Sequence, residues 1–512
     1  MARYNACEDL LDRNIAAGRA DKPAFVDPTR TVTYGELAAN SRKFANVLGA
    51  LGVRREQRVA LALLDTVDYP AAFLGSIRAG IIPVCLNTLL ATDQYAYMLA
   101  DSRSAVLFVS APLLPVLRPA LSQAPDLKHV VVVGPGAEGK ELEFADLMAK
   151  ASDEFATVDT HPDETAFWLY SSGSTGAPKG TEHVHTSLME TARLFAKGVL
   201  GIREDDVVHS AAKLFFAYGL GNALSFPMAV GATTILNPDR PSPAAVFAML
   251  EKHQPTIFCG VPTLFAAMLH DQDHAQHKGS SRLRISTSAG EALPEHIGKA
   301  WKARFGTDIV DGVGSTEMLH IFLSNHPDDI VYGTSGRAVP GYEMHLRDEN
   351  GEKGVPDGEV GELYVRGPTA ADGYWNQREK SRSTFQGEWT RTADKYTRDA
   401  TGRYTYCGRA DDMFKVSGIW VSPFEVEGAL ASHPAVLEAA VVPAMDDDNL
   451  LKPKAFVVLK PGVSADGLEA ALKDHVKAAI GLWKYPRWVE VRETLPKTAT
   501  GKIQRFKLRD EA

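Results

Sequence analysis

The chain has 512 residues, of which 45% are hydrophobic and 23% charged, and its formal net charge is −9. These fractions are close to globular averages, so they exclude disorder, collagen and coiled coil as its main character. The acidic balance is not that of a general nucleic-acid binder. At about 100–200 residues per domain, the length predicts two to four domains or subdomains.

The ends of the chain and its cysteines predict a cytoplasmic protein. No apolar run reaches the roughly 18 residues that a membrane span needs. The first residues lack the basic-then-apolar order of a signal peptide, and the last three are not a peroxisomal address. Cys7, Cys85, Cys259 and Cys407 lie far apart and form no C-x-x-C pair. They indicate reduced thiols rather than a disulfide framework or a zinc site.

Residues 33–110 alternate between helical and strand patterns. Thr33 and Glu36 have the spacing of a capping box, and we expect the helix that they begin to end at Gly52. Helices are then expected at 69–79 and 93–100, and strands at 59–64, 81–86 and 105–110. Pro83 has no backbone donor, so it predicts a sheet edge or an irregularity in the second strand. Strand–helix–strand at this pitch predicts parallel sheets with crossover helices.

The pattern changes after residue 341. Between 341 and 410, clusters of Gly, Asp and Thr separate short alternating runs such as 362–365, which predicts a small antiparallel, barrel-like β region. The last hundred residues predict an α+β unit whose clearest helix spans 466–480. No low-complexity linker is present. We therefore expect an α/β protein with a large N-terminal domain of parallel sheets, 1–410, and a small C-terminal domain, 411–512, joined by a hinge near 409–412.

A Ser/Gly-rich loop follows the apolar strand candidate at 166–170. Its glycines permit close approach of the backbone, its hydroxyls and backbone N–H groups can surround a phosphate, and Lys179 adds a positive charge. It is not a Walker A loop, because no G-K-[ST] sequence ends it. The alternative, a simple surface turn, does not account for the preceding strand, the hydroxyl density and the lysine. The predicted phosphate-binding residues are Ser171, Ser172, Gly173, Ser174, Thr175, Gly176 and Lys179.

Residues 171–180 resemble the phosphate loop of the adenylate-forming superfamily, which includes acyl- and aryl-CoA ligases, luciferases and peptide-synthetase adenylation domains. Further motifs of that superfamily follow in order, so the resemblance covers most of the chain, from about residue 165 to Arg509. It is nearest to the benzoate-activating branch of the aryl-CoA ligases. The resemblance implies the adenylate-forming fold, in which the 1–410 domain binds AMP and the small C-terminal domain is mobile.

Residues 311–317 resemble the adenine and metal motif of the superfamily. The resemblance implies that Thr316 donates to the α-phosphate and that Glu317 holds Mg²⁺, a hard cation that keeps substrate phosphates as other ligands. Val313 stands where the usual pattern has an aromatic residue, so adenine would pack on an aliphatic face. With the similar strand-end motif at 288–291, the residues implied to bind the nucleotide are Gly290, Glu291, Asp311, Gly312, Val313, Gly314 and Ser315.

Residues 389–394 resemble the ribose motif of the superfamily. The resemblance implies that Asp394 accepts hydrogen bonds from both ribose hydroxyls, a task that suits the two oxygens of a carboxylate. Arg409 would contact the ribose–phosphate side of the nucleotide, and Asp411 matches the hinge position. A charged turn with an ordinary surface ion pair is the alternative interpretation of this segment.

Two motifs near the C-terminus complete the resemblance. Residues 415–420 match a strand pair that swings toward the active site for thioester formation, where Gly418 would let the pantetheine of CoA approach closely. Residues 495–502 match the catalytic-lysine motif, with Lys502 as the lysine. The same pattern is acetylated in several relatives, so a lysine acetyltransferase and deacetylase acting on Lys502 are candidate partners. Acetylation would remove the charge.

The segments 215–222 and 318–322 resemble the acid pocket of the benzoate-activating branch. The resemblance implies a small, flat, mostly apolar pocket that suits a benzene ring rather than a long acyl chain. Its implied lining is Ala217, Tyr218, Gly314, His320 and Ile321. Tyr218 and His320 are the polar groups that could meet a ring hydroxyl, so the choice between benzoate and hydroxy-, amino- or fluorobenzoate stays open.

The implied activity is AMP-forming ligation of an aromatic acid, foremost benzoate, to coenzyme A. It uses ATP, Mg²⁺ and CoA, proceeds through an acyl-adenylate, and involves neither nucleic acid nor membrane; a homodimer is left open. A ligase for 4-hydroxybenzoate or another substituted benzoate is the first alternative. A stand-alone adenylation enzyme that loads a carrier protein is another. A non-catalytic adenylate-binding protein would be expected to lose Lys502, Glu317 or the hydroxyl loop, and all are present.

Overall fold

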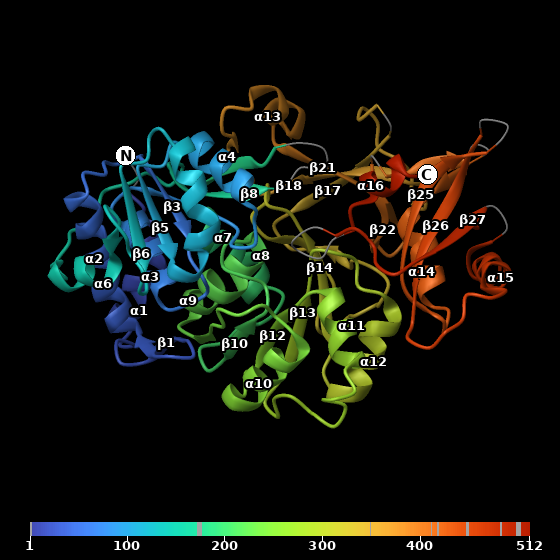
Figure 1. Ribbon diagram of the computed structural model, residues 1–512, viewed down its shortest axis with the longest axis horizontal. Helices are drawn as coiled ribbons and strands as arrows, with labels where there is room; N and C mark the ends of the chain where they lie inside the picture. The colour runs from blue at the N-terminus through green and yellow to red at the C-terminus, as the bar shows by residue number, and fades with distance from the viewer. Residues whose placement is uncertain are drawn as a thin grey trace. The chain divides into compact units, whose positions relative to one another are not determined.

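The computed structural model describes residues 3–171, 177–348, 350–410, 412–416, 419–446, 450–481, 484–497 and 503–512. The chain divides into two compact units, one made of Met1–Glu343 and Val365–Thr390, the other of Met344–Tyr364 and Arg391–Ala512 (Figure 1). The β-rich segment that the sequence indicates at 341–410 therefore contributes to both units. The hinge near 409–412 stays a prediction, because Asp411 lies outside the described residues.

An eight-stranded sheet, counted over the described residues, forms one half of the first unit. Its neighbouring strands pair in parallel from β8 through to β7, while β9 pairs antiparallel with both β8 and β19. In order across the sheet, the strands are β19 (Gly373–Tyr374), β9 (Lys179–Val184), β8 (Thr165–Ser171), β4 (Ile82–Cys85), β3 (Arg58–Ala62), β5 (Val106–Ser110), β6 (His129–Val133) and β7 (Leu142–Glu143).

Helices cover this sheet as the sequence predicts. The helix α2 (Tyr34–Ala50) begins with the expected capping box: Thr33 accepts from the backbone of Glu36, and the Glu36 carboxylate accepts from the backbone of Thr33. The helices α3 (Asp68–Arg78) and α4 (Thr92–Ser102) also lie within one or two residues of their predicted bounds. The other α-helices of the first unit, some of which pack on its second sheet, are α1 (Arg13–Ala16), α5 (Leu114–Leu117), α6 (Phe144–Lys150), α7 (Ser187–Thr191), α8 (Ala217–Leu220), α9 (Phe226–Val230), α10 (Pro243–His253), α11 (Pro262–His270), α12 (Glu295–Phe305) and α13 (Arg378–Thr384).

Pro83 does not mark a sheet edge, so that one of the two alternatives is wrong. Strand β4 lies between β8 and β3 in the interior of the sheet. Its pairing with β8 covers Val84 and Cys85, after the proline, while Pro83 lies opposite Val59 of β3. The missing backbone donor is therefore placed at the beginning of the strand, where the ladder to β8 has not started.

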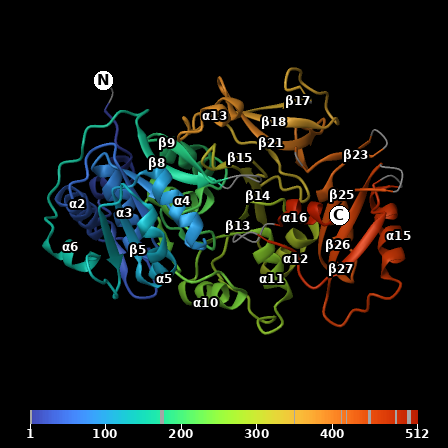
Figure 2. The ribbon, with the colours of Figure 1, turned by 45° about the horizontal axis from the view of Figure 1, so that its top comes forward.

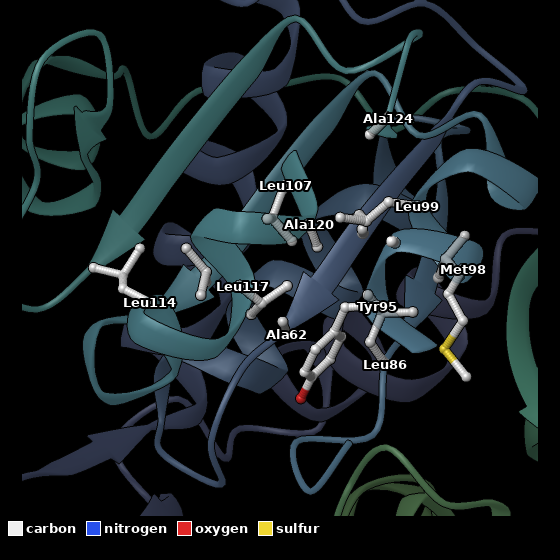
Figure 3. Close-up of a cluster of buried hydrophobic side chains, with 14 of the residues drawn as sticks. Ala62, Leu86, Tyr95, Met98, Leu99, Leu107, Leu114, Leu117, Ala120 and Ala124 are labelled. Atoms are coloured by element: carbon white, nitrogen blue, oxygen red, sulfur yellow. The ribbon is translucent and has the colours of Figure 1, made fainter. Parts of the chain in front are cut away.

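A buried apolar cluster fixes the strand that leads into the phosphate loop. Side chains from β3 and β5, among them Ala62 and Leu107, pack against Tyr95 and Leu99 of α4 (Figure 3). Trp168 of β8 belongs to the same cluster and is 1% exposed. Burial of so large a side chain strongly favours one register of β8 against the cluster. This register also fixes the position of Ser171, the last residue of the strand.

The other half of the first unit is a nine-stranded sheet, again counted over the described residues (Figure 2). Strands β10 to β14 pair in parallel, with helices α10, α11 and α12 in the connections between them. In order, the strands are β16 (Arg337–Ala338), β15 (Ile321–Ser324), β14 (Ile309–Gly314), β13 (Ile285–Ser288), β12 (Ile257–Gly260), β10 (Val207–Ser210), β11 (Thr233–Ile235), β1 (Pro23–Val26) and β2 (Thr31–Thr33). The predicted parallel sheets are confirmed.

The second unit combines short antiparallel strands with an α+β part. The first group comprises β17 (Glu343–Arg347), β18 (Gly361–Arg366), β21 (Trp389–Arg398) and β22 (Tyr404–Arg409). The first residue of β17, the end of β18 and the beginning of β21 belong to the first unit. A hairpin of β23 (Phe414–Val416) and β24 (Ile419–Val421) follows. The remaining elements are α14 (Pro423–Ala431), β25 (Val436–Met445), β26 (Leu451–Leu459), α15 (Leu468–Ile480), β27 (Trp488–Arg492) and α16 (Arg505–Asp510). The helix predicted at 466–480 is α15.

Over the described residues, none of the helices combines the length and the apolar character needed for a membrane span.

Candidate active site

The phosphate loop joins two antiparallel strands of the eight-stranded sheet. Ser171 ends β8 and Lys179 begins β9, and the two residues are register partners. The five residues between them that the sequence assigns to phosphate binding, Ser172, Gly173, Ser174, Thr175 and Gly176, lie outside the described residues. The ends of the loop are thus set by sheet pairing, which brings the hydroxyl of Ser171 and the ammonium of Lys179 to one end of the hairpin.

Glu317 lies beside the ends of this loop. It follows β14 and Thr316, and its side chain is 15% exposed. Ser171 Oγ donates to Glu317 Oε1 at 3.3 Å, and Lys179 Nζ lies 3.6 Å from the same oxygen. Burial by itself would raise the pKa of Glu317, but the charge of Lys179 and the hydrogen bonds to the carboxylate outweigh it and lower the pKa. The carboxylate is therefore ionised at neutral pH.

Tyr374 also contacts this pair. Its hydroxyl donates to Glu317 Oε1 at 2.7 Å and accepts from Lys179 Nζ at 3.1 Å. Tyr374 and Glu317 are 57 residues apart in the chain, and no local pattern in the sequence relates them. Only the pairing of β19 with β9 reveals the contact.

The surroundings of Glu317 fit Mg²⁺ bound together with a triphosphate. Mg²⁺ is usually held by one or two carboxylates, with waters and substrate phosphates as its other ligands. Glu317 supplies one ionised carboxylate, and its Oε1 is oriented by two hydroxyl donors. Lys179 and the end of the phosphate loop lie close by to meet the phosphates.

His183 stabilises the backbone of the same motif. Its Nε2 donates to the carbonyl of Thr316 at 2.8 Å, and its ring stacks on Phe167 with centroids 5.2 Å apart. Burial lowers the pKa of His183 to about 4, more than the hydrogen bond and the charge of Glu317 raise it. The imidazole is therefore neutral. Through His183, β9 holds the backbone of Thr316 in place by a hydrogen bond.

The remaining adenine-motif residues lie along β14 and after β13. Asp311 is buried, and desolvation raises the pKa of its carboxyl to about 8, although the backbone of Leu293 donates a hydrogen bond to it. It is therefore mostly protonated at neutral pH. Its assigned part in nucleotide binding, like that of Gly312, Val313, Gly314, Ser315, Thr316 and Glu291, stays a prediction. Gly290 has φ +93°, which favours glycine at the turn after β13.

His320 forms part of an aromatic cluster in the predicted acid pocket. Its ring lies 4.4 Å from that of Phe226, 5.5 Å from that of Phe195 and 5.6 Å from that of Tyr218, centroid to centroid. Phe226 and Phe195 were not assigned to the site from the sequence. Ile321 begins β15 and is buried, and Ala217 begins α8. The contact between Tyr218 and His320 therefore brings together the predicted pocket segments 215–222 and 318–322.

The position of His320 requires glycine at two neighbouring residues. A Cβ added at Gly221 would lie 2.3 Å from Cδ2 of His320, and one added at Gly314 would lie 2.6 Å from its carbonyl oxygen. Such distances are far below van der Waals contact. The two glycines thus allow the histidine ring and the end of β14 to approach closely.

The polar groups of this cluster are largely occupied. The Tyr218 hydroxyl lies 2.7 Å from Oγ1 of Thr287, a residue of β13 that the sequence did not indicate. His320 Nε2 lies 3.2 Å from the carbonyl of Tyr218, to which it donates. Burial lowers the pKa of His320 to about 3, so the imidazole is neutral and the proton resides on Nε2. Its buried Nδ1 is an acceptor without a hydrogen-bond partner among the described residues.

The predicted ribose residues lie in the second unit, at the paired ends of β21 and β22. Asp394 and Arg409 are register partners. Arg409 Nη1 donates to Asp394 Oδ1 at 3.1 Å and to the carbonyl of Thr392 at 3.2 Å. The structure thus brings the two predicted ribose-binding side chains together. Three further assigned residues, the hinge Asp411, Gly418 of the CoA approach and the catalytic Lys502, lie outside the described residues.

Two family models match the chain. The model of the AMP-binding enzyme family matches residues 12–375, and that of the AMP-binding enzyme C-terminal domain matches residues 425–502. The first of these matches covers well over half of the chain, and together they include the phosphate loop, Glu317, the acid-pocket segments and Lys502.

Curated relatives and solved structures agree with the family match. The chain is 55% identical to benzoate–CoA ligase of Thauera aromatica over 99% of its own length and 96% of the relative. It is 54% identical to 4-hydroxybenzoate–CoA/benzoate–CoA ligase of Rhodopseudomonas palustris, covering 99% and 94%. A benzoate CoA ligase structure from Burkholderia xenovorans LB400 superposes with a TM-score of 0.91 at 50% identity, covering 99% and 100%. The chain therefore belongs to the AMP-binding enzyme family, with the adenylate-forming fold.

Proposed function

We propose that the chain is an AMP-forming benzoate–CoA ligase, which converts benzoate, ATP and CoA into benzoyl-CoA, AMP and pyrophosphate. The observation that carries the proposal is the match to relatives named for benzoate over 99% of the chain. The arrangement of Lys179, Glu317 and the His320 cluster supports it, because the residues predicted to bind phosphate and the aromatic cluster around His320 lie in one unit.

In the first step, a carboxylate oxygen of benzoate attacks the α-phosphorus of ATP, and the bond to pyrophosphate breaks. The protein has to bring two anions together and to neutralise charge that develops on the phosphoryl oxygens. Lys179, the hydroxyls of the phosphate loop, Thr316 and Lys502 are suited to that task. Mg²⁺ held at Glu317 would supply further positive charge to the phosphates.

In the second step, the thiol of CoA attacks the carbonyl carbon of the adenylate, and AMP leaves. We infer that the C-terminal domain rotates about Asp411 between the two steps. This motion would move Lys502 out of the active site and bring Gly418 into it. The inference rests on the family match. Acetylation of Lys502 would switch off the first step by removing its charge. A homodimer also stays a prediction.

The proposal is tested by measuring AMP formation from ATP and Mg²⁺ with benzoate, 2-, 3- and 4-hydroxybenzoate, phenylacetate, hexanoate and octanoate, each with and without CoA. We expect AMP release that requires both CoA and benzoate or a close analogue. Pyrophosphate exchange without turnover of CoA would favour a carrier protein as acceptor instead. A preference for octanoate over every aromatic acid would contradict the proposed pocket.

Replacement of His320 by alanine is expected to change the ranking of ring-substituted benzoates. The buried Nδ1 of His320 accepts hydrogen bonds, so it favours a hydroxyl or amino substituent within reach over a fluorine of similar size. One of the relatives is indeed named for 4-hydroxybenzoate as well as benzoate. An unpaired buried group discriminates between substrates by up to several kcal/mol.

The measurement is kcat/KM for benzoate, the hydroxybenzoates, 2-aminobenzoate and 4-fluorobenzoate in the wild type and in His320→Ala. A loss confined to the acids with donor substituents would confirm the role of Nδ1. An equal loss for every acid would show that His320 only supports the pocket wall.

A further inference from the structure

Tyr374 lies where two paired strands hold its ring against Lys179. It ends β19, which pairs antiparallel with β9 through Tyr374 and Thr181. The side chain is 5% exposed, and its ring centroid lies 4.2 Å from Nζ of Lys179. This separation is within the range of a favourable cation–π contact. The ring is therefore held in place independently of its hydroxyl.

The hydroxyl of Tyr374 has one proton, and the structure shows where that proton goes. Glu317 Oε1 accepts it at 2.7 Å, because a carboxylate has no proton to donate. Lys179 Nζ donates to the same hydroxyl oxygen at 3.1 Å, because an ammonium cannot accept. The phenol thus connects the cation to the anion in one defined direction.

This connection matters because the direct contact between the charges is long. Lys179 Nζ and Glu317 Oε1 are 3.6 Å apart, beyond the usual range of a strong charge-assisted hydrogen bond. Both side chains are flexible and mostly buried, with 18% and 15% exposed. The hydroxyl between them restricts both, and Ser171 adds a longer hydrogen bond to the same carboxylate oxygen at 3.3 Å.

We propose that Tyr374 is a positioning residue, whose hydroxyl holds Glu317 and Lys179 in the arrangement that receives the Mg²⁺-bound triphosphate of ATP. The proposal rests on the function proposed above, since it concerns the same nucleotide site. Tyr374 acts through Glu317 and Lys179 and takes no part in bond making. Its effect therefore falls on binding of ATP and not on binding of the aromatic acid.

The test is Tyr374→Phe, which removes the hydroxyl and keeps the ring against Lys179. The dissociation constant of ATP in the presence of Mg²⁺ is measured by calorimetry, without acid or CoA. It is expected to rise about tenfold, the usual effect of losing a hydrogen bond to a charged group. The KM for ATP rises by a similar factor, while the KM for benzoate stays at the wild-type value.

A control variant makes the result specific. Tyr95→Phe is the matched control, because Tyr95 is also buried and its hydroxyl donates to the carbonyl of Asn87, at 2.8 Å, within the apolar cluster of α4. We expect wild-type affinity for ATP in that variant.

Unchanged ATP affinity in Tyr374→Phe would overturn the proposal. Equal losses for ATP and benzoate, with an unfolding temperature below that of Tyr95→Phe, would also overturn it, by showing a structural role. Failure of the proposed function has a different signature. In that case the wild type binds ATP with Mg²⁺ but releases no AMP with any aromatic acid, and the comparison of ATP affinities remains valid.

Discussion

Glu317→Gln is expected to reduce adenylate formation by about a hundredfold, the usual cost of removing one group that stabilises charge in a transition state. The amide oxygen can still accept from Tyr374 and Ser171, so the geometry of the side chain is kept. What is lost is the negative charge. Without it, a divalent cation has no protein carboxylate at this position, and Lys179 loses its counterion in a mostly buried site.

The measurement is benzoate-dependent pyrophosphate exchange at increasing Mg²⁺ concentration. Glu164→Gln is a matched control, because Glu164 has the same 15% side-chain exposure and is paired with Arg55 at 2.6 Å. Glu164 directly precedes β8, whereas the phosphate loop follows the end of that strand. Wild-type exchange in Glu317→Gln at saturating ATP would show that the carboxylate is dispensable.

Lys502→Ala is expected to separate the two half-reactions. Adenylate formation should fall by about a thousandfold, comparable to the loss of a cation that stabilises a transferring phosphoryl group. Thioester formation from synthetic benzoyl-adenylate and CoA should remain close to the wild-type rate, because the negative charge of the triphosphate is absent from that step. An ordinary lysine is charged at pH 7, so this role requires no shift in its pKa.

Single-turnover assays of each half-reaction check this prediction. The control is Lys507→Ala, which removes an exposed lysine of α16 near the same end of the chain. Equal losses in both half-reactions of Lys502→Ala would contradict an exchange of Lys502 for Gly418 between the steps. Unchanged adenylate formation would remove Lys502 from the catalytic residues altogether.

Local spacing explains most of what the sequence predicted correctly. The capping box at Thr33 and Glu36, the helix at 466–480 and the strand before the phosphate loop depend on residues within a few positions of one another. The parallel sheets follow from the alternation of strands and helices. Pro83 shows the limit of such rules: its missing donor could indicate an edge, but the position of the neighbouring strand decided that it lies in the sheet interior.

For the candidate site too, short motifs in the sequence predicted the residues, but not the contacts between them. Motif order identified Lys179, Glu317, His320 and the ribose pair without any coordinates, because each motif is a short run with its own chemistry. Contacts between motifs could not be predicted. Lys179 and Tyr374 are 195 residues apart, and Tyr218 and Thr287 are 69 apart. The sequence holds no periodicity that relates such positions.

The sequence by itself determined the family-typical chemistry of this protein: a hydroxyl-rich phosphate loop, a carboxylate for a hard cation, a C-terminal lysine and an aromatic acid pocket. Only the tertiary structure decided how these groups restrain one another. It placed Tyr374 in contact with Lys179 and Glu317, paired the hydroxyl of Tyr218 with Thr287, and left Nδ1 of His320 as an acceptor without a partner among the described residues. The physical reason is that side-chain hydrogen bonds and burial depend on which strands pair and which helices pack, and these are long-range properties of the chain.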